Sequence, residues 1–303
     1  MTEAHTSLPF TGERFTPECV REIWYEHWHR YAFARSLAVN KRVLDAACGE
    51  GYGSALLADV AAEVTGVDID PASVAHARAR YATKLTLRYE CADATALSFP
   101  DREFDLIVSF ETLEHLAGHE QLIAGFSRVL ADDGLLVISS PDKRTYSDLA
   151  GFRNEFHVRE LYREELLALL QPHFKEVRLY GQKLMFQSTV WALDGGNERS
   201  EIFTASAGGE SLAAGFDAAP MYFIAVCAKR ALPAQLPGLS LFGDREESVY
   251  AHYNHEIRQN MGAGARIAEL EAEVERLRGS TQTPRVKHDP APRRDWRWWR
   301  RNR

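Results

Sequence analysis

Cysteine is scarce in this chain, and the few cysteines present lie far apart. Four cysteines occur among 303 residues, and no two of them form a Cys-x-x-Cys pair. This spacing excludes a disulfide framework and a cysteine-based zinc site. No cluster of metal ligands is visible in the sequence either, so no metal is expected; a divalent ion held by scattered carboxylates is the alternative. A chain that needs no disulfides suits a reducing compartment, which predicts a cytoplasmic protein.

Long apolar runs are missing as well, and acidic residues outnumber basic ones. No run of about eighteen apolar residues occurs, so no membrane span is expected. The N-terminal segment is polar and acidic, which predicts that there is no signal peptide. The formal net charge of −7 argues against a nucleic-acid-binding surface over the whole protein, and no nucleic-acid partner is expected.

The most informative stretch that is present runs from Val43 to Gly53. Its apolar first half is typical of a short buried strand, and helix-forming residues resume after its glycines. A strand, a glycine turn and a helix in this order let backbone N–H groups approach a ligand closely. A second apolar run ends in Asp68, where a carboxylate at the tip of the next parallel strand can accept ribose hydroxyls. Together these features predict a site for an adenosine-containing cofactor.

The glycine pattern indicates which cofactor this is. A dinucleotide fingerprint that starts at Gly49 requires a sixth-position glycine, and Ser54 stands there. The alternative reading, Ala47-x-Gly49-x-Gly51 introduced by Asp45, resembles the first motif of the class I S-adenosylmethionine-dependent methyltransferases. Their usual form has glycine where this sequence has Ala47.

The resemblance continues in order along the chain. Residues 91–94 match the loop whose acid contacts the adenine amino group, residues 104–109 match the fourth strand, and residues 128–139 match the helix and strand that follow. It implies an α/β fold with a Rossmann-like seven-stranded sheet, an enzyme that transfers methyl groups, and S-adenosyl-L-methionine as the cofactor. The cofactor-binding residues so implied are Asp45, Ala47, Gly49, Gly51, Asp68, Ile69, Asp93 and Ala94.

Catalytic candidates follow the fourth strand, at the position that faces the transferred methyl group in this class. Histidine titrates near neutral pH, so His115 is the first candidate for a general base. Alternatively, His115 only shapes the pocket, and Glu111 or His157 removes the proton. Arg30 or Arg14 can pair with the methionine carboxylate of the cofactor or with an acidic substrate, although an ordinary salt bridge is an equal alternative for each.

A narrower resemblance concerns the acceptor. Ser140-Pro141, Tyr146 and the Asn-x-Phe-His run at 154–157 resemble a subset of these enzymes from bacterial surface-polysaccharide pathways, as do residues 11–15 and 29–31. This resemblance implies that Tyr146 and His157 face a glycan hydroxyl, with Arg14 on the substrate side. The alternatives are a quinone, fatty acid or lipid acceptor, or a cofactor-binding scaffold that docks to a glycan-assembly partner through its C-terminal helix.

Composition shifts divide the chain into segments. Residues 1–40 are expected to form an N-terminal arm and helix over the site, and 41–230 the methyltransferase domain, with a glycine-rich insertion at 185–220. Residues 231–243 are expected to form a linker, 244–279 a helical or coiled-coil segment, and 280–303 a disordered basic tail.

The two C-terminal segments carry their own expectations. Ile267, Leu270, Val274 and Leu277 repeat at coiled-coil spacing, which predicts self-association or docking; a solvated amphipathic extension is the alternative. In residues 291–303 three tryptophans lie among arginines, a composition typical of membrane interfaces. It predicts peripheral attachment to the inner face of the cytoplasmic membrane, and a tail without a partner, or one that stacks on nucleic acid, is the alternative.

Overall fold

The computed structural model of the chain describes residues 22–190, 192–193, 201–206 and 210–280. These residues belong to two compact units, Met1–Arg245 and Glu246–Arg303. Arg14, the N-terminal arm, the basic tail and parts of the 185–220 insertion lie outside the described residues.

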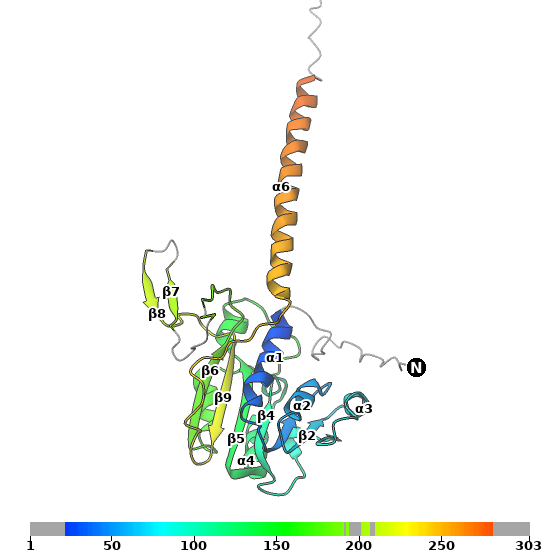
Figure 1. The fold of residues 1–303 in the computed structure, drawn as a ribbon, viewed down its shortest axis with the longest axis vertical. Coiled ribbons are helices and arrows are strands. Elements are labelled where there is room, and N and C mark those ends of the chain that lie inside the picture. The colour runs from blue at the N-terminus through cyan, green and yellow to red at the C-terminus, as the bar shows by residue number, and fades with distance from the viewer. Residues whose placement is uncertain (1–21, 191, 194–200, 207–209, 281–303) are drawn as a thin grey trace, which may run out of the picture. The chain divides into compact units, whose positions relative to one another are not determined.

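The first unit is built on one seven-stranded sheet (Figure 1) with the order β3-β2-β1-β4-β5-β9-β6. The first five strands are parallel, and β9 lies antiparallel between β5 and β6. The sheet confirms the expected Rossmann-like class I fold with seven strands. The strands are β1 (Arg42–Ala46), β2 (Glu63–Asp68), β3 (Leu87–Cys91), β4 (Phe104–Ser109), β5 (Leu130–Pro141), β6 (Glu176–Gln182) and β9 (Tyr222–Ala228).

Helices connect the strands. The described part of the N-terminal helix ends at Arg35, and the helix that follows β5 begins at Arg163. Asp70 caps the start of α3, because its side chain accepts hydrogen bonds from the backbone N–H groups of Ala72 and Ser73. The helices are α1 (Glu22–Arg35), α2 (Tyr52–Leu57), α3 (Pro71–Arg80), α4 (His119–Val129) and α5 (Arg163–Leu170), with short turns η1 (Ala94–Ala96), η2 (Leu113–His115) and η3 (Arg144–Asp148).

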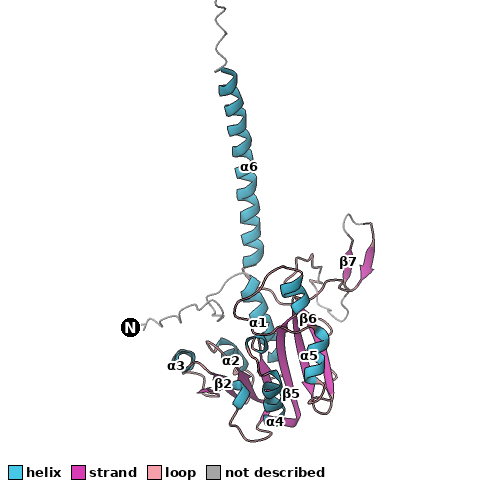
Figure 2. Cartoon of the chain, turned by 180° about the vertical axis from the view of Figure 1, so that it is seen from behind, coloured by secondary structure: helices cyan, strands magenta, loops and turns pink. Residues whose placement is uncertain are grey.

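Both faces of the sheet are buried. Alternate strand residues point to opposite sides, so Leu44 and Ile107 pack with α4 and α5, whereas Val43 and Val108 pack with α1 and α2. Figure 2 shows α4 and α5 on the sheet face turned toward the viewer. Two covered faces explain why the strands read as continuous apolar runs rather than as alternating patterns.

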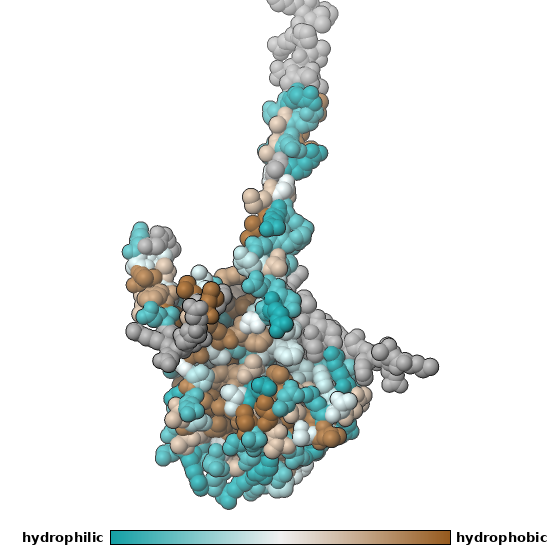
Figure 3. All heavy atoms as spheres, in the orientation of Figure 1, coloured by the Kyte–Doolittle hydropathy of each residue, from teal (hydrophilic) through white to brown (hydrophobic). Residues whose placement is uncertain are grey.

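The remaining elements lie outside the sheet. Within the insertion, β7 (Phe203–Ala205) and β8 (Leu212–Ala214) form a two-stranded antiparallel ribbon. The described part of the second unit, up to Ser280, forms the helix α6 (Ser248–Ser280), which continues through Gly262 and Gly264. Polar side chains cover much of α6, and apolar ones are scattered along it (Figure 3). Among the described helices, none combines the length and the apolarity that crossing a membrane requires.

Candidate functional site

The candidate residues gather at one edge of the sheet. Strands β1 to β5 are parallel, so their carboxyl ends meet at this edge. Strand β9 is antiparallel to both β5 and β6, so β6 runs in the same direction as β5 and ends at the same edge. Ligands in open α/β sheets bind at this edge. The sheet therefore brings segments from across the chain to one face.

The turn after β1 adopts left-handed backbone conformations at Ala47 (φ 62°), Gly49 (φ 56°) and Gly51 (φ 92°). A side chain at Gly51 would start only 2.6 Å from the Tyr89 hydroxyl, so close packing as well as φ requires glycine there. Ala47 adopts the same left-handed backbone conformation although it carries a Cβ atom, and the resulting steric strain costs about 1–2 kcal/mol. The departure from the usual glycine is thus a local strain within an intact turn.

Asp68 is fixed at the tip of β2. Its two carboxylate oxygens accept hydrogen bonds from the backbone N–H groups of Gly49 (2.8 Å) and Asp70 (2.9 Å). The adjacent Ile69 is 69% exposed, an apolar side chain held open at the edge. A fixed carboxylate beside an open apolar side chain suits a ribose joined to a flat base.

Asp93 lies at the end of the neighbouring strand. Its carboxylate accepts from the backbone N–H (2.8 Å) and the hydroxyl (2.7 Å) of Thr95 and so caps η1. Ala94 is buried behind it. Asp68 and Asp93 therefore occupy adjacent strand ends, β2 and β3.

Asp45 differs from Asp68 and Asp93 because it is fully buried. It accepts hydrogen bonds from Ser54 Oγ (2.6 Å) and from the Tyr31 hydroxyl (3.1 Å). Burial raises the pKa of Asp45 to about 7, against the opposing effect of these two hydrogen bonds. The structure thus shows Asp45 bracing the turn through α1 and α2, and its contact with the cofactor stays a prediction.

Arg30 is a fully buried cation in α1. Its Nε donates to Gln182 Oε1 (2.8 Å), its Nη2 lies 3.5 Å from Glu111 Oε1, and its guanidinium stacks over the Tyr222 ring at 4.5 Å. Within the described chain neither Nη atom donates a hydrogen bond. Buried donors without acceptors are costly, and an anionic group of a ligand would satisfy them.

Glu111 follows β4 in a left-handed conformation, with φ at 48°. Its backbone N–H donates to Ser139 Oγ (2.9 Å), and Ser139 Oγ donates back to the Glu111 carboxylate (2.6 Å). A non-glycine residue held at positive φ by two such bonds is a strained position, and strain of this kind concentrates at functional sites.

The predicted histidines and tyrosine form one aromatic cluster beside Glu111. His115 and His157 lie edge to face at 5.0 Å between ring centroids, and Tyr146 stacks on His157 at 5.2 Å. Tyr146 lies 5.9 Å from Tyr222, on whose ring Arg30 rests. The fold thus brings residues from distant parts of the sequence together beside the carboxyl end of β4. Asp68 and Asp93 lie further along the same edge, at the ends of β2 and β3.

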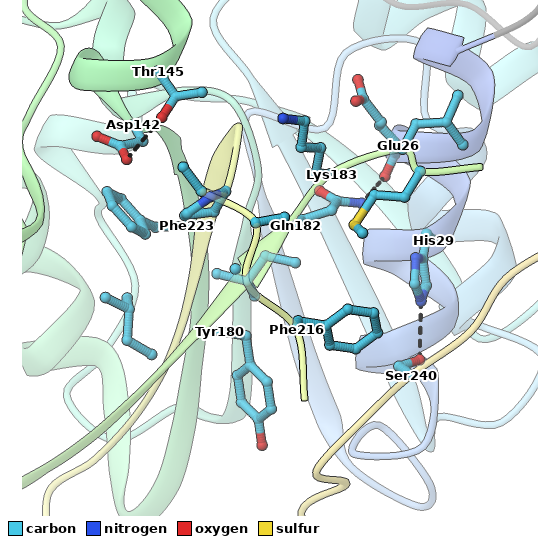
Figure 4. A pocket seen from close by; sticks show the side chains of 18 of the residues that line it. Glu26, His29, Asp142, Thr145, Tyr180, Gln182, Lys183, Phe216, Phe223 and Ser240 are labelled. Atoms are coloured by element: carbon cyan, nitrogen blue, oxygen red, sulfur yellow. Dashed lines mark hydrogen bonds between the residues drawn. The ribbon is translucent and has the colours of Figure 1, made fainter. Parts of the chain in front are cut away.

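A large cavity opens beyond Arg30, at the carboxyl ends of β5 and β6 (Figure 4). Its volume is about 1270 Å³, and polar groups and aromatic rings line it together. Neither Asp68 nor Asp93 lines it. Gln182 connects the cavity to the buried cluster, because it accepts from Arg30 and donates to the Glu26 carbonyl (2.9 Å). Polar residues of the lining include Glu26, His29, Asp142, Thr145, Gln182 and Lys183.

Glu26 is the residue that sequence reasoning missed as a specific candidate. Burial raises the pKa of its carboxyl to about 7, although the charge of Arg30 opposes this. The only sequence signal was a carboxylate on the same predicted helix as Arg30. Nothing in the sequence indicated that Gln182, more than 150 positions away, would lie against both residues.

Comparisons with known proteins now identify the family. The sequence model of a family described as "Methyltransferase domain" matches residues 44–138, from β1 to β5. A relative from Mycolicibacterium smegmatis, described as a probable S-adenosylmethionine-dependent methyltransferase, is 38% identical over 175 residues, which are 57% of this chain and 67% of the relative. The chain belongs to the S-adenosylmethionine-dependent methyltransferases.

Two further relatives of this methyltransferase show how far the likeness reaches. A protein of the same description from Mycobacterium tuberculosis is 37% identical over 184 residues, 59% of this chain and 66% of its own length. A 2-methyl-6-phytyl-1,4-hydroquinone methyltransferase of Synechocystis is 36% identical over 103 residues, 34% of this chain and 32% of its own. The chain spans about two thirds of the length of the two mycobacterial relatives.

The site of this methyltransferase fits its cofactor, S-adenosyl-L-methionine. Asp68 would accept the ribose hydroxyls, Asp93 the adenine amino group, and Ile69 would cover the base. The unsatisfied Nη atoms of Arg30 would take the methionine carboxylate. The bound cofactor supplies a methyl group on a positively charged sulfur, which leaves as a neutral thioether.

Proposed function

We propose that this methyltransferase transfers the methyl group to a hydroxyl of a saccharide acceptor, as in the assembly of a bacterial surface polysaccharide. The observation that carries the proposal is the cavity at the β5 and β6 ends. Its volume of about 1270 Å³ exceeds the roughly 300–1,000 Å³ typical of small-ligand pockets. It therefore has room for more than one sugar ring.

The lining of the cavity suits a glycan. Hydrogen-bonding groups such as Asp142, Gln182 and Lys183 alternate with rings such as Phe216 and Phe242. Sugars present hydroxyls at their edges and C–H surfaces on their faces, so a mixed lining satisfies both. Thr145 lines the cavity, and the adjacent Tyr146 contacts His157 and Tyr222.

We assign removal of the hydroxyl proton to Glu111 among the three candidates. Both ring nitrogens of His157 face partners, Glu160 Oε1 at 2.6 Å and Asn154 Nδ2 at 3.0 Å. His115 directs Nδ1 to the Phe156 carbonyl (3.2 Å). Glu111 is held at the β4 end by Ser139 and Arg30, and a base must be oriented in this way to accept a proton.

The test is release of S-adenosylhomocysteine from the full chain with a panel of nucleotide sugars, lipid-linked glycans and free saccharides. We expect turnover with at least one saccharide, and Glu111→Gln should lower kcat at least about a hundredfold while S-adenosylhomocysteine binding persists. Turnover confined to acceptors without a sugar hydroxyl would exclude the saccharide. An unchanged kcat in Glu111→Gln would exclude this base.

A hydroquinone hydroxyl or a ring carbon of a quinone is the second candidate acceptor. It is favoured by the 36% identity to the Synechocystis hydroquinone enzyme and by apolar members of the lining such as Leu179 and Ile224. Including a short-chain hydroquinone in the same panel separates the two candidates. Binding of cofactor with no turnover on any acceptor would favour a scaffold role.

The proposal extends to the partners of the chain. We propose that α6 mediates self-association. We also propose that residues 291–303 attach the chain to the membrane that carries lipid-linked saccharides, and that Arg14 contacts the substrate. The tail carries arginines among three tryptophans, a composition that favours an anionic membrane surface. The chain should co-sediment with vesicles rich in phosphatidylglycerol, and equal sedimentation without residues 291–303 would exclude the tail.

A further inference from the structure

We propose that Glu114, His115 and His157 form a binding site for a divalent transition-metal ion, contrary to the sequence expectation of no metal. Each residue offers one ligand atom, and the three atoms lie within 4.8 Å of one another. Metal–ligand bonds of about 2.0–2.2 Å place ligand atoms up to roughly 4.4 Å apart. Small side-chain rotations therefore complete the site.

Glu114 supplies the reason for a cation. Its carboxylate is buried, and among the described residues its Oε2 atom accepts no hydrogen bond. A buried carboxylate oxygen that no donor of the described chain reaches is stabilised either by a proton or by a metal ion.

The surroundings of both histidines match those of metal ligands, which use one ring nitrogen and anchor the other. His115 Nδ1 faces the Phe156 carbonyl, and its Nε2 lies 3.8 Å from Glu114 Oε1. His157 Nδ1 donates to Glu160 Oε1 at 2.6 Å. Its Nε2 faces the Asn154 amide at 3.0 Å, and binding of a metal at that nitrogen displaces this contact.

The donor set indicates the class of ion. Two imidazoles and one carboxylate suit Mn²⁺, Fe²⁺, Co²⁺ or Zn²⁺ and leave coordination positions open. The proposed function places the acceptor hydroxyl at this end of β4, and in that case the hydroxyl oxygen fills an open position. The ion lowers the pKa of the hydroxyl, Glu111 takes the proton, and the oxygen forms the bond to the methyl carbon as the carbon–sulfur bond breaks.

The test uses the full chain stripped with a chelator and titrated with MnCl₂, monitored by calorimetry and by the electron paramagnetic resonance signal of free Mn²⁺. No acceptor is present, so the result is independent of the proposed function. We expect one saturable ion per chain, and at least tenfold weaker binding in Glu114→Gln and in His115→Ala. His173→Ala, at a half-buried histidine just after α5, is the matched control and should bind like the parent chain.

The two variants are checked for folding by circular dichroism and S-adenosylhomocysteine uptake. Absence of saturable binding in the parent chain overturns the proposal. So does equal binding in the parent, Glu114→Gln and His115→Ala, or equal weakening in the His173→Ala control.

A different observation, on α6, carries a second inference. We infer that two copies of this chain pair through α6 as a parallel two-stranded coiled coil. Ile267, Leu270 and Val274 are exposed by 57%, 48% and 44% on the described chain, and with Leu277 they occupy alternating a and d positions. β-Branched residues at a with leucine at d favour parallel dimers.

The residues that flank this seam fit a second copy. With Ile267 at a, Arg266 and Glu273 fall at g positions, and Glu271 and Arg278 fall at e positions of the following turns. In a parallel pair each g residue meets the e residue five positions later on the partner helix, so both pairings are of opposite charge. Asn260 falls at the preceding a position, and a buried asparagine pair fixes a parallel register.

Light scattering of the full chain measures this association. We expect a dimer, and Leu270→Glu should give a monomer. The control Ala272→Glu, at the outward f position of the same turn, should remain dimeric. A monomeric parent chain, or a dimeric Leu270→Glu variant, overturns the inference.

Cross-linking tests the orientation. Asn260→Cys should form an intermolecular disulfide under mild oxidation, because parallel a positions face one another, whereas Arg258→Cys at an f position should not exceed the parent chain. Equal cross-linking of the two variants overturns the parallel arrangement.

Discussion

At the scale of single residues, the site combines strained backbone with buried charge. Ala47 and Glu111 both have positive φ without being glycine, and Asp45, Arg30 and Glu114 are charged groups removed from water. Strain and desolvation both raise the energy of the folded chain unless neighbours or a ligand compensate. Each of these residues therefore has a measurable signature in stability.

Ala47→Gly should stabilise the folded chain by about 0.5–1 kcal/mol. Glycine relieves the left-handed strain of about 1–2 kcal/mol, and its greater freedom in the unfolded chain offsets roughly half of that gain. Urea unfolding measures the difference. Ala47→Val should lose stability, because a β-branched residue adopts positive φ least readily; a Val variant as stable as Ala47→Gly would contradict this account.

Asp45→Asn should change how stability depends on pH. Burial raises the pKa of Asp45 in the folded chain to about 7, whereas in the unfolded chain it is about 3.9. Between about pH 4 and pH 7 the folded state therefore binds the extra proton, and stability falls as pH rises, by at most about 1.4 kcal/mol per unit.

The free energy of unfolding, measured at pH 5, 6, 7 and 8, should fall less steeply with rising pH in Asp45→Asn than in the parent chain. Asparagine keeps the shape of the side chain but does not titrate. Identical slopes for the two proteins would show that Asp45 is ionised throughout this range.

At the scale of elements, close contact between helices α1 and α2 positions the cofactor turn. A Cβ atom built on Gly53 in α2 would lie 2.0 Å from Cζ of Tyr31 in α1. Tyr31 also donates to Asp45. The two helices and the turn thus form one packed unit with no room for an added carbon.

Gly53→Ala should destabilise the chain by about 1–3 kcal/mol, the usual range for overpacking, and weaken S-adenosylhomocysteine binding as Tyr31 moves. Gly125→Ala in α4 is the control, since nothing lies within 4 Å of its added carbon. Alanine in a helix interior should stabilise that variant by about 0.5–1 kcal/mol. Calorimetry and urea unfolding report both effects, and equal stability of the two variants would refute the packing argument.

The elements also show which parts of the site the sequence could reveal. The glycine turn, Asp68 and Asp93 were predictable because local periodicity and turn chemistry place each of them directly after a strand. The contacts among Arg30, Gln182 and Glu26 were not, because they depend on β6 pairing with β9, the strand that follows the insertion and joins β6 to β5. The burial of Glu114 was equally invisible, since the sequence shows only an acidic residue next to a histidine.

At the scale of the whole molecule, two units differ in what stabilises them. The sheet unit buries two apolar faces and binds the cofactor, whereas the apolar seam of α6 is exposed and so lacks the packing that supplies most helical stability in proteins. Binding to the folded state stabilises only the unit that binds. Thermal unfolding should therefore report the two units separately.

S-adenosylhomocysteine at a hundred times its dissociation constant should stabilise the sheet unit by about 2.7 kcal/mol, seen as a raised Tm. Melting of α6 should instead depend on protein concentration. Asp68→Ala should lose the ligand-dependent shift, whereas Asp133→Ala, an exposed carboxylate near the other end of β5, should keep it. A full shift in Asp68→Ala would remove the main support for the cofactor site.

The position of β9 in the sheet has a consequence for synthesis on the ribosome. β9 covers the outer edge of β5, but Tyr222 follows Pro141 by roughly 80 residues. At about 5–20 residues per second, the edge of β5 waits about 4–16 s for its neighbour. During this interval the nascent chain presents an unpaired apolar strand, to which chaperones and other nascent chains can bind. We expect the nascent chain to depend most on chaperones while the roughly 80 residues between β5 and β9 are being synthesised.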